Sequence, residues 1–463
     1  MGVKTVKVDV NELTIGMFVA KLDRPWTQTP FPLQGFYIRD LDEIKDLKTH
    51  CNYVHIDVVK GDRPVATHLR THDPVSSGVK SHSGSKAGPL SKAGRKARKV
   101  ASNVSVAALK ISRNIYIEST PLKKEVQQAQ TLHRNVFKAI GDVMNQIDGD
   151  LSVSIQQTKR AAGEMVDSVV RNPDAFTWLS RVRESDEHTY AHSVRSAIWA
   201  IMFGRHIGLS KKDMDALALG VLLKDVGKLK LDTALLENKQ RNVAQEQEYQ
   251  SFVEHSADIL RATQGVEPRV ISVVKTHCER LNGSGFPQHL TGDKIPLLGK
   301  VAGIVTYYDE TTNPRGESLP LAPSRAVSNL YELRNIEFQE ELVIEFIRAI
   351  GLYPTGTLVE LTSGEVGVVV EQNFSRRLKP KVMLVMDATK RPLSTYQLLD
   401  MSKDDAEKQK LIDEGKVRFN EIEKIEIAQD LEPGTYDVDV ATIRDEYLFK
   451  KEKKGWLSKL LRR

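Results

Sequence analysis

Histidine and carboxylate side chains are concentrated in four segments between residues 187 and 287. The segments read EHTYAH from residue 187, LKDVGK from 223, VEHSA from 253 and HCERLNGSGFP from 277. Imidazole nitrogen and carboxylate oxygen are the usual protein ligands of zinc, iron and manganese. Helices that face one another in a bundle can bring such side chains together from distant parts of a chain. The segments therefore predict a metal site; the competing interpretation is a set of satisfied core or surface histidines.

The chemistry that such a site would support is phosphodiester hydrolysis. This reaction needs a metal-activated water and positive charge placed on the phosphate. Lys228, Arg280 and Arg315 are the basic candidates for holding the phosphate. Because Lys and Arg are mostly exposed in folded proteins, solvated surface residues are the alternative interpretation of these three.

The elements that would position this chemistry are mostly helices, which residues 173–355 predict between loops containing Gly and Pro. Before them, VKTVKVDV, FVAKLD and YVHIDVV predict strands, and DEIKDLKTH predicts a helix. Apolar residues at helical spacing from Ala129 to Ile147 predict two long helices that end before Pro173. These helices either support a homodimer or pack on the next domain. Farther on, GTLVEL, EVGVVVEQ and KVMLVMD predict strands.

The sequence accordingly predicts a multidomain protein that is mainly α-helical. Its predicted parts are a small α+β N-terminal domain (1–75), a flexible basic Ser/Gly/Lys linker (76–103), long connecting helices (104–172), a helical domain (173–355), a small β appendage (356–400) and a C-terminal extension with a basic amphipathic end (401–463).

Two basic segments have more than one interpretation. The linker composition predicts a tether, and binding to nucleic acid or acidic lipid is the alternative. No aromatic residues alternate with its basic ones to form a single-strand platform. Near the C-terminus, Trp456, Leu457, Leu460 and Leu461 share one helical face amid Lys and Arg. Such a face suits an anionic membrane surface, a docking partner or a frayed helix, so the case for peripheral membrane contact is weak.

The composition is that of an ordinary globular protein in a reducing compartment. Hydrophobic residues make up 40% and charged residues 28% of the 463 positions, and the formal net charge is +6. Two cysteines, Cys51 and Cys278, cannot make a disulfide framework. The charged start lacks a signal peptide's apolar run, and no stretch of about 18 apolar residues is present. We therefore expect a cytoplasmic protein, with no strong case for nucleic acid as a partner.

Residues 187–315 resemble the HD-GYP family, a branch of the HD phosphohydrolases. Members of that family are helical and hydrolyse the bacterial messenger cyclic di-GMP at a site of two or three metals. The order and spacing of the family's His, Asp, Lys, Arg and Gly positions hold here, up to the signature Gly285-Phe286-Pro287. Residues 12–38 also resemble the domain of unknown function that is often fused ahead of HD-GYP domains. The resemblance implies an HD-type helical bundle in a protein of bacterial cyclic di-GMP signal transduction.

The family's site roles carry over to particular positions. The resemblance implies catalytic roles for Asp225 and Lys228. It implies substrate contacts, to cyclic di-GMP or its linear product, at Arg280, Gly285, Phe286, Pro287 and Arg315, and metal ligation at His192, Asp225, His255, His277 and Cys278.

Several ligand positions depart from the family pattern. Lys224 stands where the His of the His-Asp pair is expected, Cys278 where a second His is expected, and Thr306 where an Asp is expected. Asn282 and Phe286 replace an Asp and a Tyr of the substrate loop. The implied first metal keeps only His192 and Asp225 of its ligands. The second keeps three of four ligands, with Cys278 as a possible thiolate, so we expect one divalent iron, manganese or zinc ion rather than two, or none.

Two interpretations of Lys224 are open. A protonated amine is a compact positive charge and not a ligand, so Lys224 beside Asp225 replaces the first metal electrostatically, and the loss of an anion at Thr306 fits that exchange. The alternative is drift in a domain no longer selected for catalysis. Hydrolysis is then weak or absent, since losing one metal weakens water activation.

Three functions follow from these alternatives. The chain is an impaired cyclic di-GMP phosphodiesterase, a non-catalytic sensor that binds the nucleotide, or a scaffold for other signalling proteins. The fold does not choose among them, because function depends on the site.

Overall fold

A computed structural model describes residues 5–24, 29, 31, 35–38, 41–57, 106–109, 111–145, 151–181, 188–238, 240–314, 319–373, 376–414, 416 and 424–449. The chain divides into two compact units: Met1–Ala97 with Asn373–Pro380, and Arg98–Gln372 with Lys381–Arg463. The basic linker, Arg315 and the amphipathic end around Trp456 lie outside the described residues, and the predictions made for them stay predictions.

The first unit contains a four-stranded antiparallel sheet in the order β1-β4-β2-β3. Its elements are β1 (Thr5–Asp9), β2 (Phe18–Leu22), β3 (Phe36–Tyr37), α1 (Leu41–His50) and β4 (Tyr53–Asp57). The alternating apolar side chains of the strands, such as Val54 and Ile56, form a buried core with Ile44 and Leu47 of α1. The strands and helix predicted for this region are confirmed.

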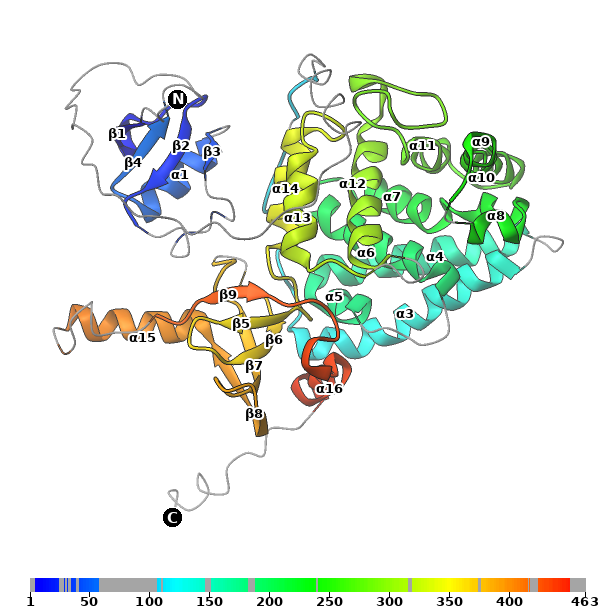
Figure 1. The fold of residues 1–463 in the computed structure, drawn as a ribbon. Coiled ribbons are helices and arrows are strands. Elements are labelled where there is room, and N and C mark those ends of the chain that lie inside the picture. The colour runs from blue at the N-terminus through cyan, green and yellow to red at the C-terminus, as the bar shows by residue number, and fades with distance from the viewer. Residues whose placement is uncertain are drawn as a thin grey trace. The chain divides into compact units, whose positions relative to one another are not determined.

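The second unit begins with an extended strap and two long helices, α3 (Leu122–Asn145) and α4 (Leu151–Arg171). The two long helices were predicted, but α3 starts only at Leu122. The described residues before it, 106–109 and 111–121, form no helix and include a turn at Arg113 and Asn114. Helices α5 (Pro173–Arg181) and α6 (His188–Ile207) follow and pack against this pair. Figure 1 shows α3 and α4 side by side along one edge of the helical part.

The remaining helices complete the bundle, in which α7, α12 and α14 pack directly against α6 (Figure 1). They are α7 (Lys211–Leu223), α8 (Thr233–Glu237), α9 (Val243–Gln250), α10 (Phe252–Ala262), α11 (Pro268–Thr276), α12 (Leu297–Thr312), α13 (Pro323–Glu332) and α14 (Glu340–Ile350). Edge-to-face aromatic contacts connect helices α6, α12 and α14 at the core. Trp199 of α6 lies 5.5 Å from Tyr308 of α12, and Tyr308 lies 5.3 Å from Phe346 of α14.

The strap, residues 106–109 and 111–121, is fastened to this bundle at several points. Ser112 donates its backbone N–H to the Ile207 carbonyl at the end of α6, and the Tyr116 hydroxyl donates to the Leu209 carbonyl. Arg113 makes a two-pronged ion pair with Glu345 of α14, at 2.8 and 2.7 Å. The strap is therefore part of the folded bundle and not a loose connection.

A five-stranded antiparallel sheet in the order β8-β7-β6-β5-β9 completes the second unit. Its strands are β5 (Leu358–Leu361), β6 (Val366–Glu371), β7 (Lys381–Met386), β8 (Pro392–Asp400) and β9 (Ile427–Asp430), with α15 (Met401–Asp413) and α16 (Val440–Phe449) beside them. The predicted strands are present. Strand β9 follows α15 in the chain and lies in the region predicted as a separate extension. It nevertheless belongs to this sheet, because it pairs with β5.

Buried polar contacts hold this sheet on the helices. The Trp178 indole N–H of α5 donates to the Val370 carbonyl of β6 at 2.9 Å, and the Gln372 N–H donates to Asp174 at 3.3 Å. Helix α16 packs against both β6 and α3 (Figure 1). The predicted fold class is confirmed: a mainly helical bundle with a small α+β N-terminal domain and a β-rich C-terminal part. No helix in the described part of the chain has the length and apolar character needed to cross a membrane.

Glu345 provides a test of how the strap is held. Burial by itself would raise the pKa of Glu345, but hydrogen bonds from Arg113 and His206 and the charge of Arg348 hold it well below its usual value. We expect Glu345→Gln to destabilise the second unit by about 1–3 kcal/mol at pH 7, because it leaves partly buried cations without their carboxylate partner. Urea unfolding followed by the fluorescence of buried Trp178 and Trp199 measures this.

The pH dependence has a defined sign. A depressed folded-state pKa gives stability that is present above about pH 4.3, the unfolded value, and is lost as the pH falls toward the folded value. The difference between the wild type and Glu345→Gln therefore shrinks below about pH 4. Glu341→Gln on the same helix is the control, since Glu341 has no ion-pair partner among the described residues. Equal effects of both substitutions would contradict the assignment.

Candidate functional site

The predicted site residues are carried by five helices and the turns that end them. His192 lies on α6, His255 on α10 and Thr306 on α12, whereas Lys224 and His277 are the residues that end α7 and α11. Asp225 precedes a 3₁₀ helix, Val226–Lys230. The apolar faces of these helices pack together, and the polar residues occupy the places where helix ends meet.

The turn from Lys224 to Lys228 is fixed by α10. The Ser256 hydroxyl donates to the Lys224 carbonyl at 2.9 Å and accepts the Gly227 N–H at 2.7 Å. A Cβ on residue 227 would lie 2.1 Å from the Phe252 carbonyl oxygen, so only glycine lets the turn approach α10 this closely. The 3₁₀ turn then brings Lys228 back over Asp225.

Asp225 is buried between two ammonium groups. Lys224 Nζ contacts Asp225 Oδ2, and Lys228 Nζ lies 2.5 Å from Asp225 Oδ1. The Ser193 hydroxyl of α6 adds a hydrogen bond to Oδ2 at 3.2 Å. Both oxygens of the carboxylate that the resemblance assigns as a shared metal ligand are therefore engaged by cations of the chain itself.

Lys224 is the most deeply buried cation of this group, with a side chain only 1% exposed. Burial lowers the pKa of Lys224, an effect that the Asp225 carboxylate opposes and the Lys228 charge reinforces. A buried ammonium is stable only when a carboxylate compensates it. The two groups therefore depend on each other.

A second polar cluster joins α6 to α12. His192 Nδ1 lies 2.6 Å from Asp309 Oδ2, and Arg195 Nε lies 3.0 Å from Asp309 Oδ1. Burial alone would raise the pKa of Asp309. The Arg195 charge and the His192 hydrogen bond nevertheless hold this pKa below its usual value. Burial, together with the charge of Lys224, lowers the pKa of His192, so a neutral imidazole donates from Nδ1.

This arrangement leaves His192 Nε2 buried without a hydrogen-bond partner among the described residues. A histidine oriented by a carboxylate through one nitrogen is a common support for metal binding by the other. Thr306, where the resemblance expects an Asp ligand, is also buried, and its hydroxyl oxygen has no hydrogen-bond partner in the described structure. One imidazole is thus presented to the site, but the anionic ligand that would accompany it is missing.

His277 and Cys278 contact each other at the end of α11. His277 Nδ1 bonds to the Val274 carbonyl at 2.8 Å, and its Nε2 lies 3.2 Å from Cys278 Sγ. Burial, with the charge of Lys224, lowers the pKa of His277 to about 3. Burial raises the pKa of Cys278 to about 12. Burial thus favours the thiol over the thiolate at Cys278 when no metal is bound, and the metal ligation predicted for this residue stays a prediction.

The predicted ligands do not form a metal centre together. No group of three His, Cys, Asp or Glu side chains within the described ranges is placed to hold a metal ion. His255 Nδ1 is buried without a partner there, Asp225 is engaged by two lysines, and Lys224 is buried against it. The donor set, with an ammonium, a protonated thiol and a threonine at ligand positions, does not fit the two-metal site of the family.

The glycine-rich loop after α11 is held in place by its own polar residues. The buried Glu279 carboxylate accepts the backbone N–H groups of Gln288 at 2.8 Å and Leu290 at 2.9 Å. A Cβ on residue 285 would lie 2.4 Å from the Cys278 carbonyl oxygen, so Gly285 permits the loop to fold tightly. Phe286 and Pro287 follow, joined by a cis peptide bond.

Arg280 contacts the backbone of its own loop, and the substrate contact predicted for it stays a prediction. Its Nη1 donates to the carbonyls of His277 and Glu279, at 3.2 and 2.9 Å, and its guanidinium lies over the Phe338 ring. Nε lies 3.6 Å from Glu337. These contacts make Arg280 a brace of the loop, which accounts for its presence without a phosphate.

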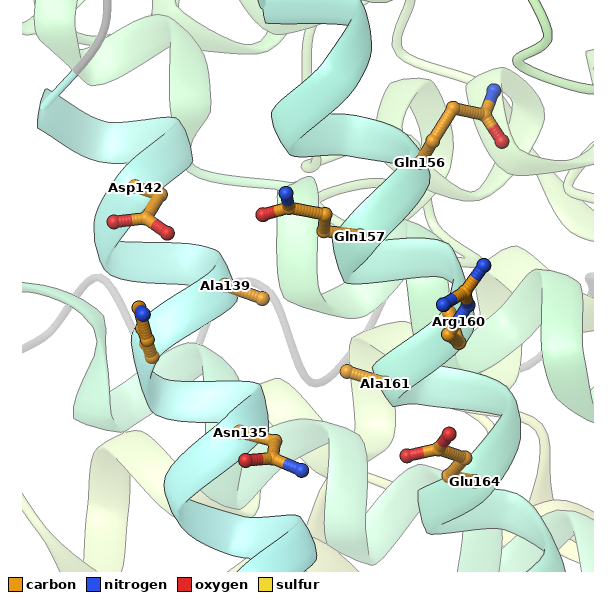
Figure 2. Close-up of a pocket in the computed structure, with 9 residues that line it drawn as sticks. Asn135, Ala139, Asp142, Gln156, Gln157, Arg160, Ala161 and Glu164 are labelled. Carbon is orange, nitrogen blue, oxygen red and sulfur yellow. The ribbon is translucent and has the colours of Figure 1, made fainter.

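An open hollow of about 760 Å³ lies elsewhere, between α3 and α4. Figure 2 shows polar side chains on both helices around a floor of Ala139 and Ala161. None of the predicted site residues lines it. The candidate site is therefore the cluster around Asp225.

Two ranges of the sequence match known domain families. Residues 180–340 match the HD domain family, and residues 5–158 match a domain of unknown function, DUF3391. The chain therefore carries a DUF3391 domain followed by an HD domain, as the resemblance predicted.

The relatives are bacterial phosphodiesterases. Over 405 residues the chain is 27% identical to cyclic di-GMP phosphodiesterase PA4108 of Pseudomonas aeruginosa, covering 86% of this chain and 89% of that protein. Over 173 residues it is 28% identical to 3'3'-cGAMP-specific phosphodiesterase 2 of Vibrio cholerae, covering 36% of this chain and 33% of that protein. Bd1817, a HDG"Y"P protein from Bdellovibrio bacteriovorus, aligns over 74% of this chain and 98% of its own, with 14% identity and a TM-score of 0.41.

Sequence reasoning missed Arg195 and Asp309. Their signal was the spacing of His192 and Arg195, three residues apart on one helical face, with Asp309 one turn after Thr306. It also missed Ser256, whose role depends on the close approach of α10 to the turn at Gly227.

The mutual dependence of Lys224 and Asp225 is testable. We expect Lys224→Met to destabilise the protein by about 3–5 kcal/mol, because it removes one partner of a buried pair. Asp225→Asn alone should also destabilise the protein, and the double variant should lose less than the sum of the two single losses, because both substitutions remove the same Lys224–Asp225 contact. Urea unfolding of the three variants gives the coupling energy.

The control is Lys212→Met, at the exposed start of the same helix, which should change stability by less than about 0.5 kcal/mol. If Lys224→Met were as stable as the Lys212 variant, the buried ion pair would not be what holds this turn.

Proposed function

We propose that this chain is a cyclic di-GMP-binding signalling protein whose HD domain holds lysine ammonium groups where the family holds metal, and that it binds the nucleotide with little or no hydrolysis. The observation that carries the proposal is the engagement of both Asp225 oxygens by Lys224 and Lys228. The similarity to cyclic di-GMP phosphodiesterase PA4108 supports the choice of ligand.

Binding of a divalent ion is unfavourable at this cluster. Phosphodiesterases built on HD domains generally depend on divalent metals. Here a metal at Asp225 would have to displace Lys224, whose buried side chain has no solvent to enter. An ion that left Lys224 in place would face a like charge in a poorly solvated site, where repulsion is strong.

The same cluster favours an anion. Lys224 and Lys228 supply two ammonium groups around one buried carboxylate, and the buried Asp309 is already compensated by Arg195. The other charged group acting on Lys224 is Glu310, whose side chain is largely exposed and therefore screened by water. A phosphate group beside Lys228 makes charge-assisted hydrogen bonds to an ammonium that is already oriented.

The first requirement for catalysis, an activated water, is not met at this cluster. Attack on a phosphodiester needs an activated water as well as positive charge on the phosphate. The lysines supply the second and not the first, because an ammonium cannot acidify a bound water as a metal does. Each 1.4 kcal/mol of lost activation is a factor of ten in rate, so hydrolysis falls to a negligible level.

The biological setting follows from these features. A nucleotide-binding HD domain attached to a DUF3391 domain suits a receptor that changes its contacts with other signalling proteins. The reducing-compartment composition supports action in the cytoplasm.

Calorimetry with cyclic di-GMP tests the proposal. We expect full-length protein to bind the nucleotide with the same affinity in EDTA and in Mn²⁺, and chromatography to show no linear product. Lys228→Gln should weaken binding roughly tenfold or more, since a hydrogen bond to a charged group contributes about 1.5–3 kcal/mol. Lys230→Gln, two residues on and exposed, is the matched control and should leave affinity unchanged.

A gain-of-metal variant is the positive control. Lys224→His, Cys278→His and Thr306→Asp together restore the ligand types of the family pattern and should raise the bound metal toward about two ions per chain. Metal-dependent formation of linear product by the wild type would overturn the proposal in favour of a surviving phosphodiesterase. Absence of nucleotide binding would favour a scaffold.

A further inference from the structure

Aromatic rings connect the Lys228 cluster to helix α9. Phe252, buried at the start of α10, lies 6.0 Å from the His277 ring and 6.2 Å from the Phe286 ring. On its other side it lies 5.5 Å from Tyr249, the half-buried residue near the end of α9. The rings form a continuous wall that leads from the candidate site to the connection between α8 and α9.

Two cations face this wall. Lys228 Nζ lies 4.6 Å from the Phe252 ring centre and 5.8 Å from the Tyr249 ring centre. Arg241 stacks its guanidinium on Tyr249 at 3.7 Å. Tyr249 therefore sets the spacing between an ammonium group suited to a phosphate and a planar guanidinium.

The position of Arg241 is fixed before any ligand arrives. Its Nε donates to the Leu235 carbonyl at 3.2 Å, and its Nη1 lies 3.5 Å from Glu246. Asn242, the next residue, starts α9 with a capping box that involves Gln245. Within the described structure Nη2 has no acceptor, and the side chain keeps 17% of its surface exposed. Arg241 thus presents the N–H donors of Nη2 in a fixed orientation.

We infer that Arg241 recognises the guanine base of the nucleotide whose phosphate lies at Lys228, and that Tyr249 positions it. This inference rests on the proposed function. A planar guanidinium donates to the O6 and N7 acceptors of guanine together, whereas adenine offers a donor in place of O6. Aromatic rings next to such a group add a stacking surface for bases. The pair therefore selects guanine over adenine.

Competition between bases gives the direct test. The full-length protein is titrated with cyclic di-GMP and with cyclic di-AMP in EDTA, and the ratio of the two affinities is compared between variants. We expect the wild type to prefer the guanine ligand and Arg241→Lys, which keeps the charge but loses the planar fork, to reduce that ratio roughly tenfold or more. Tyr249→Leu should reduce the ratio as well, whereas Tyr249→Phe, which keeps the aromatic ring, should leave it at the wild-type value.

Arg334→Lys is the matched control. Arg334 stacks on Tyr331 at the same 3.7 Å and contacts none of the residues around Lys228, so its substitution should leave the ratio unchanged. A wild type that binds both nucleotides equally, or an Arg241→Lys variant with an unaltered ratio, overturns the inference while nucleotide binding stands. A wild type that binds neither nucleotide overturns the proposed function itself, and the inference with it.

Discussion

The Asp225 carboxylate lies buried between the ammonium groups of Lys224 and Lys228, and the turn that carries all three depends on this arrangement. Neither lysine could be buried without the carboxylate, and the carboxylate could not be buried without them. Ser256 and the close approach at Gly227 hold the turn against α10, so the charges keep their geometry. The neighbouring His192–Asp309–Arg195 cluster is compensated separately.

This exchange of charge changes what the site can bind. The family surrounds metal cations with His and Asp, whereas this chain places a lysine at one ligand position and removes an acid at Thr306. Under the proposed function, the protein itself supplies positive charge at this position, and the complement of the site is an anion rather than a cation. Under the proposed function, weak or absent hydrolysis and binding of the nucleotide have a single electrostatic cause.

The sequence predicted the parts of this account that depend on local pattern or family resemblance. Alternation and helical spacing predicted the strands β1, β2 and β4 and the helices α3 and α4, and spacing of motifs predicted the HD domain. Contacts between distant segments were not predictable: β9 joins the sheet although it follows α15 in the chain, and the strap before Leu122 is held on the bundle by the pairing of Arg113 with Glu345. The raised pKa of Cys278 follows from burial, which spacing does not reveal.

The central claim is that lysine nitrogen, and not metal, occupies the coordination space of Asp225. Anomalous diffraction from crystals of the protein grown with excess Mn²⁺ tests it most directly. The account predicts no anomalous peak bonded to Asp225, with Lys224 Nζ and Lys228 Nζ remaining within hydrogen-bond distance of its two oxygens. A manganese peak within coordination distance of Asp225 and His192, with Lys224 turned away, would contradict it.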